Sequence, residues 1–361
     1  MKVELTPEQW QLVGYQALSL GGFISLNIAL NFFNSWALKK NSGGPEFDFP
    51  VFYTMTHMVA TMLGSGVIMS MKKPLTGYPS FGQLKEYSLG LFPIAICTTA
   101  NLACNNVSLT LVSLFLNQVI KAAAPLPTML FSFILERKTY TLKMVVTCTM
   151  IVVGTVLAIP MSSKGGTTSL VGVIIVIISM LAASLKPVVM TLVFKGMSDK
   201  PKLDPPVVLF YDSFLSFWIM LMYWLISPTE RAGTIEYIGK RSSTAILVIC
   251  AGASMAFFFN LCTYFVIKYT SAVTCMVASN GNKVINIVIS GIIANAMKDA
   301  RNLCGVVLVC LSIAAYAYAS HDAKKNPPKP FFKKDVETGG KASEATPLAP
   351  SPDTGRCCVI C

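Results

Sequence analysis

The chain has 361 residues, of which 53% are hydrophobic and only 13% are charged, and its mean hydropathy is +0.60. A soluble globular domain carries about 25% charged residues, so this composition excludes a soluble enzyme or binding domain and indicates a polytopic membrane protein. The net charge is +12, but much of it falls in loops and in the C-terminal tail. Positive charge there orients a chain in the membrane or contacts anionic lipid, so membrane lipid is the expected partner and nucleic acid is not.

Ten apolar stretches are long enough to cross about 30 Å of hydrocarbon, and we expect all of them to be helices because a helix satisfies its own backbone in lipid. The fold class is therefore an all-α polytopic membrane protein. Pro125 and Pro127 predict a kink or an unwound segment just past Lys121. Very short connections near residues 106–108 and 268–270 predict tight antiparallel neighbours. The ten stretches lie at about 12–37, 49–71, 87–105, 109–135, 141–160, 168–194, 205–227, 244–267, 271–297 and 302–320.

The distribution of Lys and Arg predicts that both termini are cytosolic. With that orientation, 18 cationic residues lie on the cytosolic side and 8 on the other, or 11 against 8 without the tail. Cytosolic segments of membrane proteins carry the excess of positive charge.

An internal repeat is predicted by sliding the chain by 162 residues, which places Lys121 on Lys283 and Cys148 on Cys310. Five stretches lie on each side of a Gly/Ser-rich link at 162–169. An odd number of spans gives the two halves opposite topology, and such inverted repeats place a substrate site at their interface near the midplane. We expect one ten-helix domain over residues 1–320, with halves at about 12–160 and 168–320, and a tail at 321–361.

Two lysines stand alone in long uncharged stretches: Lys121 is the only charge between Glu86 and Glu136, and Lys283 the only one between Lys268 and Lys298. An ammonium at the bilayer centre costs several kcal/mol, so it is expected to face a cavity and meet an anion. Polar residues at helical spacing surround each lysine and predict a cavity suited to phosphate. The two polar stripes are Ser113, Asn117, Lys121, Thr128 and Ser132, and Ser279, Lys283, Asn286 and Ser290 with Asn280 and Asn282 beside them.

The alternative is that these polar residues only pack helices together, which is common in membranes. That explanation suits the serines and threonines, but it accounts poorly for the lysines, since neither stretch contains an acidic partner.

Asp212 is the only carboxylate clearly within an apolar stretch. It could pair with Lys121, Lys186 or Lys283 as a gate or proton carrier, accept hydrogen bonds from a nucleobase, or lie at the interface near the start of its helix. Lys186 is expected to extend to the cytosolic surface. Tyr211 and Tyr264 could stack on a base, or pack like most aromatic residues in such helices.

The ends of the chain predict no structural domain. The N-terminus, MKVELTPEQWQ, lacks a cleavable leader and an import presequence, which argues against a plastid or mitochondrial inner membrane. The tail from about His321 is polar and Pro-rich, so we expect it to be disordered. It ends CCVIC, where Cys358 opens a prenylation-like box and Cys357 could be acylated, or neither has a role.

No catalytic or metal-binding motif is found in the sequence, so we expect neither an enzyme nor a cofactor. We expect the cysteines outside the tail to be small core residues and not to form a disulfide framework.

Several segments carry a resemblance to a known group. They are NFFNSWALKK at 31–40, FPVFYTMTHM at 49–58, IKAAAPLPTMLFSFILERK at 120–138, FYDS at 210–213 and SAVTCMVASNGNKVINIVISGI at 271–292. Over nearly all of residues 12–320 the chain resembles the nucleotide-sugar transporter and triose-phosphate translocator group of the drug/metabolite transporter superfamily.

The resemblance implies ten helices in an inverted repeat and a Golgi or ER antiporter that exchanges a nucleotide sugar for the nucleoside monophosphate. It implies phosphate binding by Lys283 and Lys121, base contact by Tyr211, Asp212 and Ser213, and sugar or phosphate contact by Asn282. A homodimer is left open. The chain departs from the group at Asp212-Ser213 and Asn280-Gly281, and it has Lys283-Val284 where triose-phosphate carriers have lysine-arginine.

Two other functions remain open. One is an exchanger of sugar phosphates, triose phosphates or phosphoenolpyruvate in an organelle membrane. The other is a receptor or trafficking regulator that keeps the transporter fold without transporting.

Overall fold

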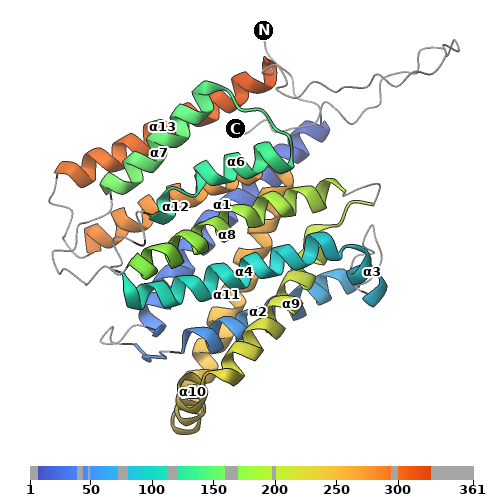
Figure 1. Ribbon diagram of the computed structural model, residues 1–361, viewed down its shortest axis with the longest axis vertical. Helices are drawn as coiled ribbons and strands as arrows, with labels where there is room; N and C mark the ends of the chain where they lie inside the picture. Colours follow the sequence, from blue (N-terminus) through green and yellow to red (C-terminus); the bar gives the residue numbers. More distant parts are fainter. Residues whose placement is uncertain are drawn as a thin grey trace, which may run out of the picture.

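The computed structural model describes residues 7–38, 44–47, 49–71, 80–112, 117, 120–158, 170–196, 201–293 and 300–326, and the regular structure in these residues is helical throughout (Figure 1). Many of the helices run in similar directions, and α11 crosses α4 and α8 steeply (Figure 1). The helices are α1 (Pro7–Leu38), α2 (Pro50–Met71), α3 (Phe81–Glu86), α4 (Ser88–Leu111), α6 (Pro125–Leu135), α7 (Leu142–Ala158), α8 (Leu170–Lys195), α9 (Pro205–Ile226), α10 (Pro228–Lys240), α11 (Ser242–Tyr269), α12 (Ala272–Ile293) and α13 (Ala300–Lys325).

Seven helices in this part of the chain are long and apolar enough to cross a membrane, namely α1, α2, α4, α8, α9, α11 and α13. The remaining three expected stretches contain the shorter apolar helices α6 and α7 and the 22-residue helix α12. The chain is therefore an integral membrane protein, as its composition predicts.

Two of the expected chain breaks are confirmed and one is wrong. The turn at residues 123–124 separates the helical residues 120–122 from α6, and only Thr270 and Ser271 separate α11 from α12. The expected connection at 106–108 does not exist, because α4 continues to Leu111 and ends where Val112 becomes extended. Helices α3 and α10 were not expected, since neither sequence contains a long apolar run.

The helices pack in four main pairs: α4 lies on α8, α1 on α11, α2 on α9 and α7 on α13. The last pair is visible as the outer layer at the top of Figure 1. Helices α6 and α12 also contact each other, and this contact brings the two lysine-bearing segments together.

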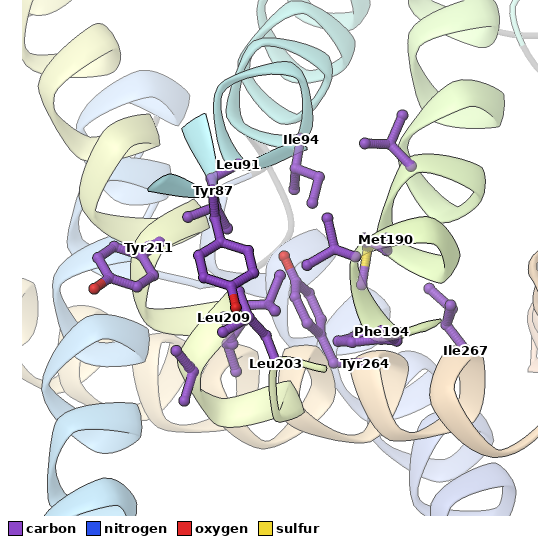
Figure 2. Close-up of a cluster of buried hydrophobic side chains, with 14 of the residues drawn as sticks. Tyr87, Leu91, Ile94, Met190, Phe194, Leu203, Leu209, Tyr211, Tyr264 and Ile267 are labelled. Carbon is purple, nitrogen blue, oxygen red and sulfur yellow. The ribbon is translucent and has the colours of Figure 1, made fainter. Parts of the chain in front are cut away.

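At one end of the bundle, next to the α8–α9 connection, an apolar cluster fills the space between the helices (Figure 2). We call it the end cluster. It joins the last turns of α2, α8 and α11 to the first turns of α4, α9 and α12, with one residue from α1. Its buried members are Phe23, Met69, Leu84, Tyr87, Leu91, Ile94, Val189, Met190, Val193, Phe194, Leu203, Val207, Val208, Leu209, Tyr211, Tyr264, Val266, Ile267 and Cys275.

Two glycines allow α7 and α13 to approach closely. A Cβ atom on Gly305 would lie 2.3 Å from the backbone nitrogen of Ala158, and one on Gly154 would lie 3.0 Å from the backbone nitrogen of Val309. Small residues at such contacts let membrane helices gain van der Waals contact along their backbones.

Glu136, directly after α6, ties that helix to α8. Its buried carboxylate accepts hydrogen bonds from Ser132 Oγ at 2.7 Å and Lys195 Nζ at 2.8 Å, and it pairs with Lys138 at 2.9 Å. Burial alone would raise the pKa of the Glu136 carboxyl, but Lys138, Lys195 and Ser132 outweigh it and hold that pKa below its ordinary value.

Candidate substrate site

The break before α6 leaves main-chain carbonyls without their helical partners. Pro125 has no N–H, so the carbonyl of Lys121, four residues earlier, cannot receive the usual helical hydrogen bond and accepts only a longer one, from the N–H of Ala124 at 3.3 Å. The N–H of Leu126 bonds to the carbonyl of Ala123 at 3.1 Å. In a regular helix it would bond to the carbonyl of Ala122, which therefore also lacks its usual helical partner. Carbonyl groups at this depth must find other donors.

Helix α12 supplies those donors. Lys283 Nζ donates to the carbonyl of Lys121 at 3.0 Å, and Asn280 Nδ2 donates to the carbonyl of Ala122 at 2.8 Å. Asn280 Oδ1 in turn accepts a hydrogen bond from Lys283 Nζ at 2.9 Å, one helical turn away. The Lys283 ammonium is thus held between its own helix and the broken segment.

The Lys121 ammonium points to a third helix. Lys121 Nζ donates to Asn105 Oδ1 of α4 at 2.6 Å, and Asn117 Nδ2 donates to Ser108 Oγ of α4 at 2.7 Å. The contribution of α4 to the site was not expected. A pattern in the sequence could have predicted it, because polar residues recur on α4 at spacings of three and four residues, namely Thr98, Asn101, Asn105 and Ser108.

Neither Lys121 nor Lys283 pairs with a carboxylate in the part of the chain that the structure describes; their hydrogen-bond partners are neutral oxygens. Lys283 lies 11 residues into the 22-residue helix α12, about 16 Å along it and so near its centre. Two positive charges at this depth with neutral neighbours form a site suited to an anion.

Three asparagines near the lysines have buried polar atoms for which the described residues provide no partner. Both polar atoms of Asn282, which is 2% exposed, are unpaired, as are Oδ1 of Asn117 and Oδ1 of Asn286. A buried polar atom without a hydrogen bond costs about 1–3 kcal/mol. These amides can therefore donate to and accept from a polar ligand.

Asp212 belongs to a second polar cluster. Its buried carboxylate pairs with Lys186 Nζ at 2.9 Å, which makes the expectation that Lys186 extends to the surface wrong. A buried carboxylate of this kind requires a cationic partner, and the lysine is drawn inward to supply it. Thr98 Oγ1 donates to Asp212 at 2.9 Å, Ser216 Oγ at 3.1 Å, and the Tyr264 hydroxyl donates to it as well.

Tyr211 and Ser213 flank Asp212 and are also buried. The Tyr211 hydroxyl accepts from the backbone N–H of Ser80 at 2.9 Å and donates to Gln83 Oε1 at 2.9 Å, next to α3. The polar atoms of Tyr211, Asp212 and Tyr264 are thus engaged within the protein.

Other predicted features fall outside the described residues, namely Ser113, the link at 162–169, and Cys357 and Cys358. The cysteines that the structure describes are all free, and no cluster of His, Cys, Asp or Glu that could hold a metal occurs among the described residues.

Comparison with known proteins identifies the family. The profile of the Triose-phosphate Transporter family matches residues 17–317. The chain belongs to this family. Its members are transporters rather than enzymes, and the resemblance drawn from the sequence is confirmed.

Curated relatives come from Arabidopsis thaliana. A "Probable sugar phosphate/phosphate translocator" is 24% identical over 77% of this chain and 75% of its own length. GDP-mannose transporter GONST5 is 22% identical over 89% of this chain and 90% of its own length. UDP-uronic acid transporter 1 is 26% identical over 81% and 91%. A solved crystal structure superposes with a TM-score of 0.60 at 12% identity, covering 86% of this chain and 98% of the other, which shows the shared fold.

Proposed function

We propose that the protein is a secondary antiporter that exchanges a nucleotide sugar for a nucleoside monophosphate across the Golgi or ER membrane. The observation that carries this proposal is the meeting of Lys121 and Lys283 at the broken helix, with neutral oxygens as their only partners among the described residues. Asn117, Asn280 and Asn282 complete the phosphate and sugar contacts.

The charge of the site matches both substrates. The two phosphates of a nucleotide sugar carry one negative charge each, and a phosphate monoester such as a nucleoside monophosphate carries about −1.5 to −2 at pH 7. Two lysines neutralise either ligand, so the loaded carrier can cross and the empty one, with two buried cations, cannot do so cheaply. This favours obligatory exchange.

The residue after Lys283 favours a ligand larger than a triose phosphate. Val284 is 3% exposed and packs in an apolar cluster with residues of α7 and α13, where the triose-phosphate carriers have a second cation. The unpaired amides instead favour a larger ligand held partly by hydrogen bonds. Relatives named as GDP-mannose and UDP-uronic acid transporters agree with this choice. Base contact by Tyr211, Asp212, Ser213 and Tyr264 has less support, because three of these side chains are already engaged.

The second candidate is exchange of a sugar phosphate for phosphate. Relatives named as sugar phosphate/phosphate translocators favour it, and the same two lysines would bind the phosphate.

The proposed architecture is ten transmembrane helices in two inverted halves with both termini in the cytosol. The helix packing supports it. A shift of 162 residues places α1 on α8, α2 on α9, α4 on α11 and α7 on α13. Exchanging the halves then converts the α4–α8 pair into the α11–α1 pair and leaves the α2–α9 and α7–α13 pairs unchanged.

The test is uptake by purified protein in proteoliposomes across a panel of nucleotide sugars and sugar phosphates. Vesicles preloaded with UMP or GMP should take up a nucleotide sugar faster than empty vesicles, and Lys283→Ala or Lys121→Ala should lower uptake about tenfold or more, the effect of roughly 1.4 kcal/mol. Lys143→Ala is the matched control, because that lysine is exposed and pairs with Asp322 away from the site. Stimulation by internal phosphate alone would establish the second candidate, and full uptake by Lys283→Ala would remove the site.

A further inference from the structure

We propose that the Asp212–Lys186 ion pair is the lock that keeps the substrate site closed at the α8–α9 end, and that these two residues gate transport rather than contact substrate. The inference rests on the proposed carrier function, and it gives the second polar cluster a role that phosphate binding leaves unexplained.

The ion pair lies within the second half of the chain, and a hydrogen bond from Thr98 ties it to the first half. Lys186 comes from α8 and Ser216 from α9, while Thr98 comes from α4 and Tyr264 from α11. Asp212 is 3% exposed and receives all four donors, so its charge is fully compensated in this arrangement. Because Thr98 precedes the central link and the other residues follow it, movement of the halves apart at this point must break the hydrogen bond between Thr98 and Asp212.

The lock lies between the substrate lysines and the end of the bundle. On α4, Thr98 precedes Asn105, the partner of Lys121, by seven residues, about 10 Å along the helix. On α8, Ser184 donates to the carbonyl of Ala124 in the broken segment at 3.1 Å, two residues before Lys186. The ion pair therefore lies nearer the α8–α9 end of the bundle than the two lysines do.

Beyond the ion pair, the end cluster fills the same end of the bundle. Figure 2 shows Tyr264 beside Phe194, Met190 and Leu209, and the Tyr264 and Phe194 rings lie 6.3 Å apart. Tyr264 belongs to both layers, since its ring packs in the end cluster and its hydroxyl bonds to Asp212. Opening the cluster would move that ring and hydrate the two charges together.

Helix α8 carries a feature that suits such a movement. Pro187, directly after Lys186, lies inside α8 and removes one helical hydrogen bond. Proline positions are where helices bend, so the lock is placed at a hinge of the helix that carries it. The count of Lys and Arg assigns this end to the cytosol, and the structure is closed there.

Native cysteines allow the lock to be tested without substrate. Cys275, 1% exposed, lies in the end cluster, and Cys97, 6% exposed, precedes Thr98. Cys148, 0% exposed, lies in the α7–α13 cluster and reports on general unfolding. The full chain in nanodiscs is treated with a membrane-impermeant maleimide, and the labelling rate of each cysteine is followed by mass spectrometry.

The double variant Lys186→Met/Asp212→Asn removes the ion pair without leaving a buried charge. We expect it to label Cys275 and Cys97 about tenfold faster than wild type, with Cys148 unchanged. Tyr264→Phe keeps the ring and the ion pair and removes one hydrogen bond, so a rise of about threefold is expected. Tyr53→Phe is the matched control, because the Tyr53 hydroxyl bonds to Asn34 in a separate apolar cluster.

If Cys275 is labelled at the wild-type rate both in Tyr264→Phe and in the double variant, the proposed lock is contradicted. A rise at Cys148 equal to that at Cys275 in Tyr264→Phe would contradict it too, because the change would then be general loosening. Labelling needs no substrate, and a failed transport assay therefore contradicts the proposed function alone.

Discussion

At the scale of single residues, Pro125 decides how the two lysines meet. A residue with an N–H at this position would bond to the carbonyl of Lys121 and continue the helix. Its absence turns that carbonyl toward Lys283 Nζ, 3.0 Å away. The site is thus built from a missing main-chain donor as much as from the lysines.

Pro125→Ala should therefore lower uptake by about fivefold or more, since the new N–H competes with Lys283 for the carbonyl of Lys121. The melting temperature in detergent should not fall, because the change repairs a helix. Uptake assays and thermal unfolding measured on the same preparation check both outcomes.

Pro127→Ala is the matched control for this substitution. The carbonyl that its new N–H would reach belongs to Ala123, which already accepts from Leu126 at 3.1 Å. An equal loss of uptake in both variants would contradict the role given to Pro125.

At the scale of helices, two glycines bring the backbones of α7 and α13 close together. Gly305 faces the backbone of Ala158 and Gly154 faces that of Val309. Neither helix carries a residue of the substrate site, so this pair supports the bundle and leaves the transport residues untouched.

Gly305→Ala should destabilise the protein by about 1–3 kcal/mol, because the added methyl group meets rigid backbone and the helices must separate. Thermal unfolding in detergent should show a lower melting temperature than wild type. Gly21→Ala, inside α1 where the added methyl group meets no atom within 4 Å, should not lower it, because alanine favours a helix more than glycine does. Equal melting temperatures for Gly305→Ala and wild type would contradict the tight α7–α13 contact.

The positions of most helices could be predicted from the sequence, because apolar length and proline chemistry act locally. The end of α4 could not, since its polar last turns resemble a connection in the sequence, whereas Ser108 is buried and bonds to Asn117, 9 residues further along the chain. In the candidate site, solitary charges predicted Lys121 and Lys283 as ligands of a phosphate, and this stays a prediction. The choice of Lys186 as the partner of Asp212, and the role of Asn105, depend on the contact of helices far apart in sequence.

At the scale of the whole molecule, charge balance distinguishes the two polar clusters. Lys186 is neutralised by Asp212, whereas Lys121 and Lys283 have only neutral partners among the described residues. In the proposed exchange, a dianion bound by both lysines would give a neutral complex in both directions.

Exchange between dianions at pH 7.5 should therefore proceed at the same rate under membrane potentials of either sign. Lys121→Gln removes one of the two charges and should make the rate depend on the sign of the potential, at about 2.3 kcal/mol per charge per 100 mV. A potassium gradient with valinomycin sets the potential. A potential-dependent rate in wild type would contradict the charge match.

Lys283 is held by a main-chain oxygen, and this affects which substitutions position 121 can accept. Every amino acid offers the same oxygen, so exchanging the side chain at position 121 alters the electrostatics of the chamber yet keeps the opposite lysine anchored. A substitution at position 121 can thus change the charge of the candidate site without removing the hydrogen bond that holds Lys283.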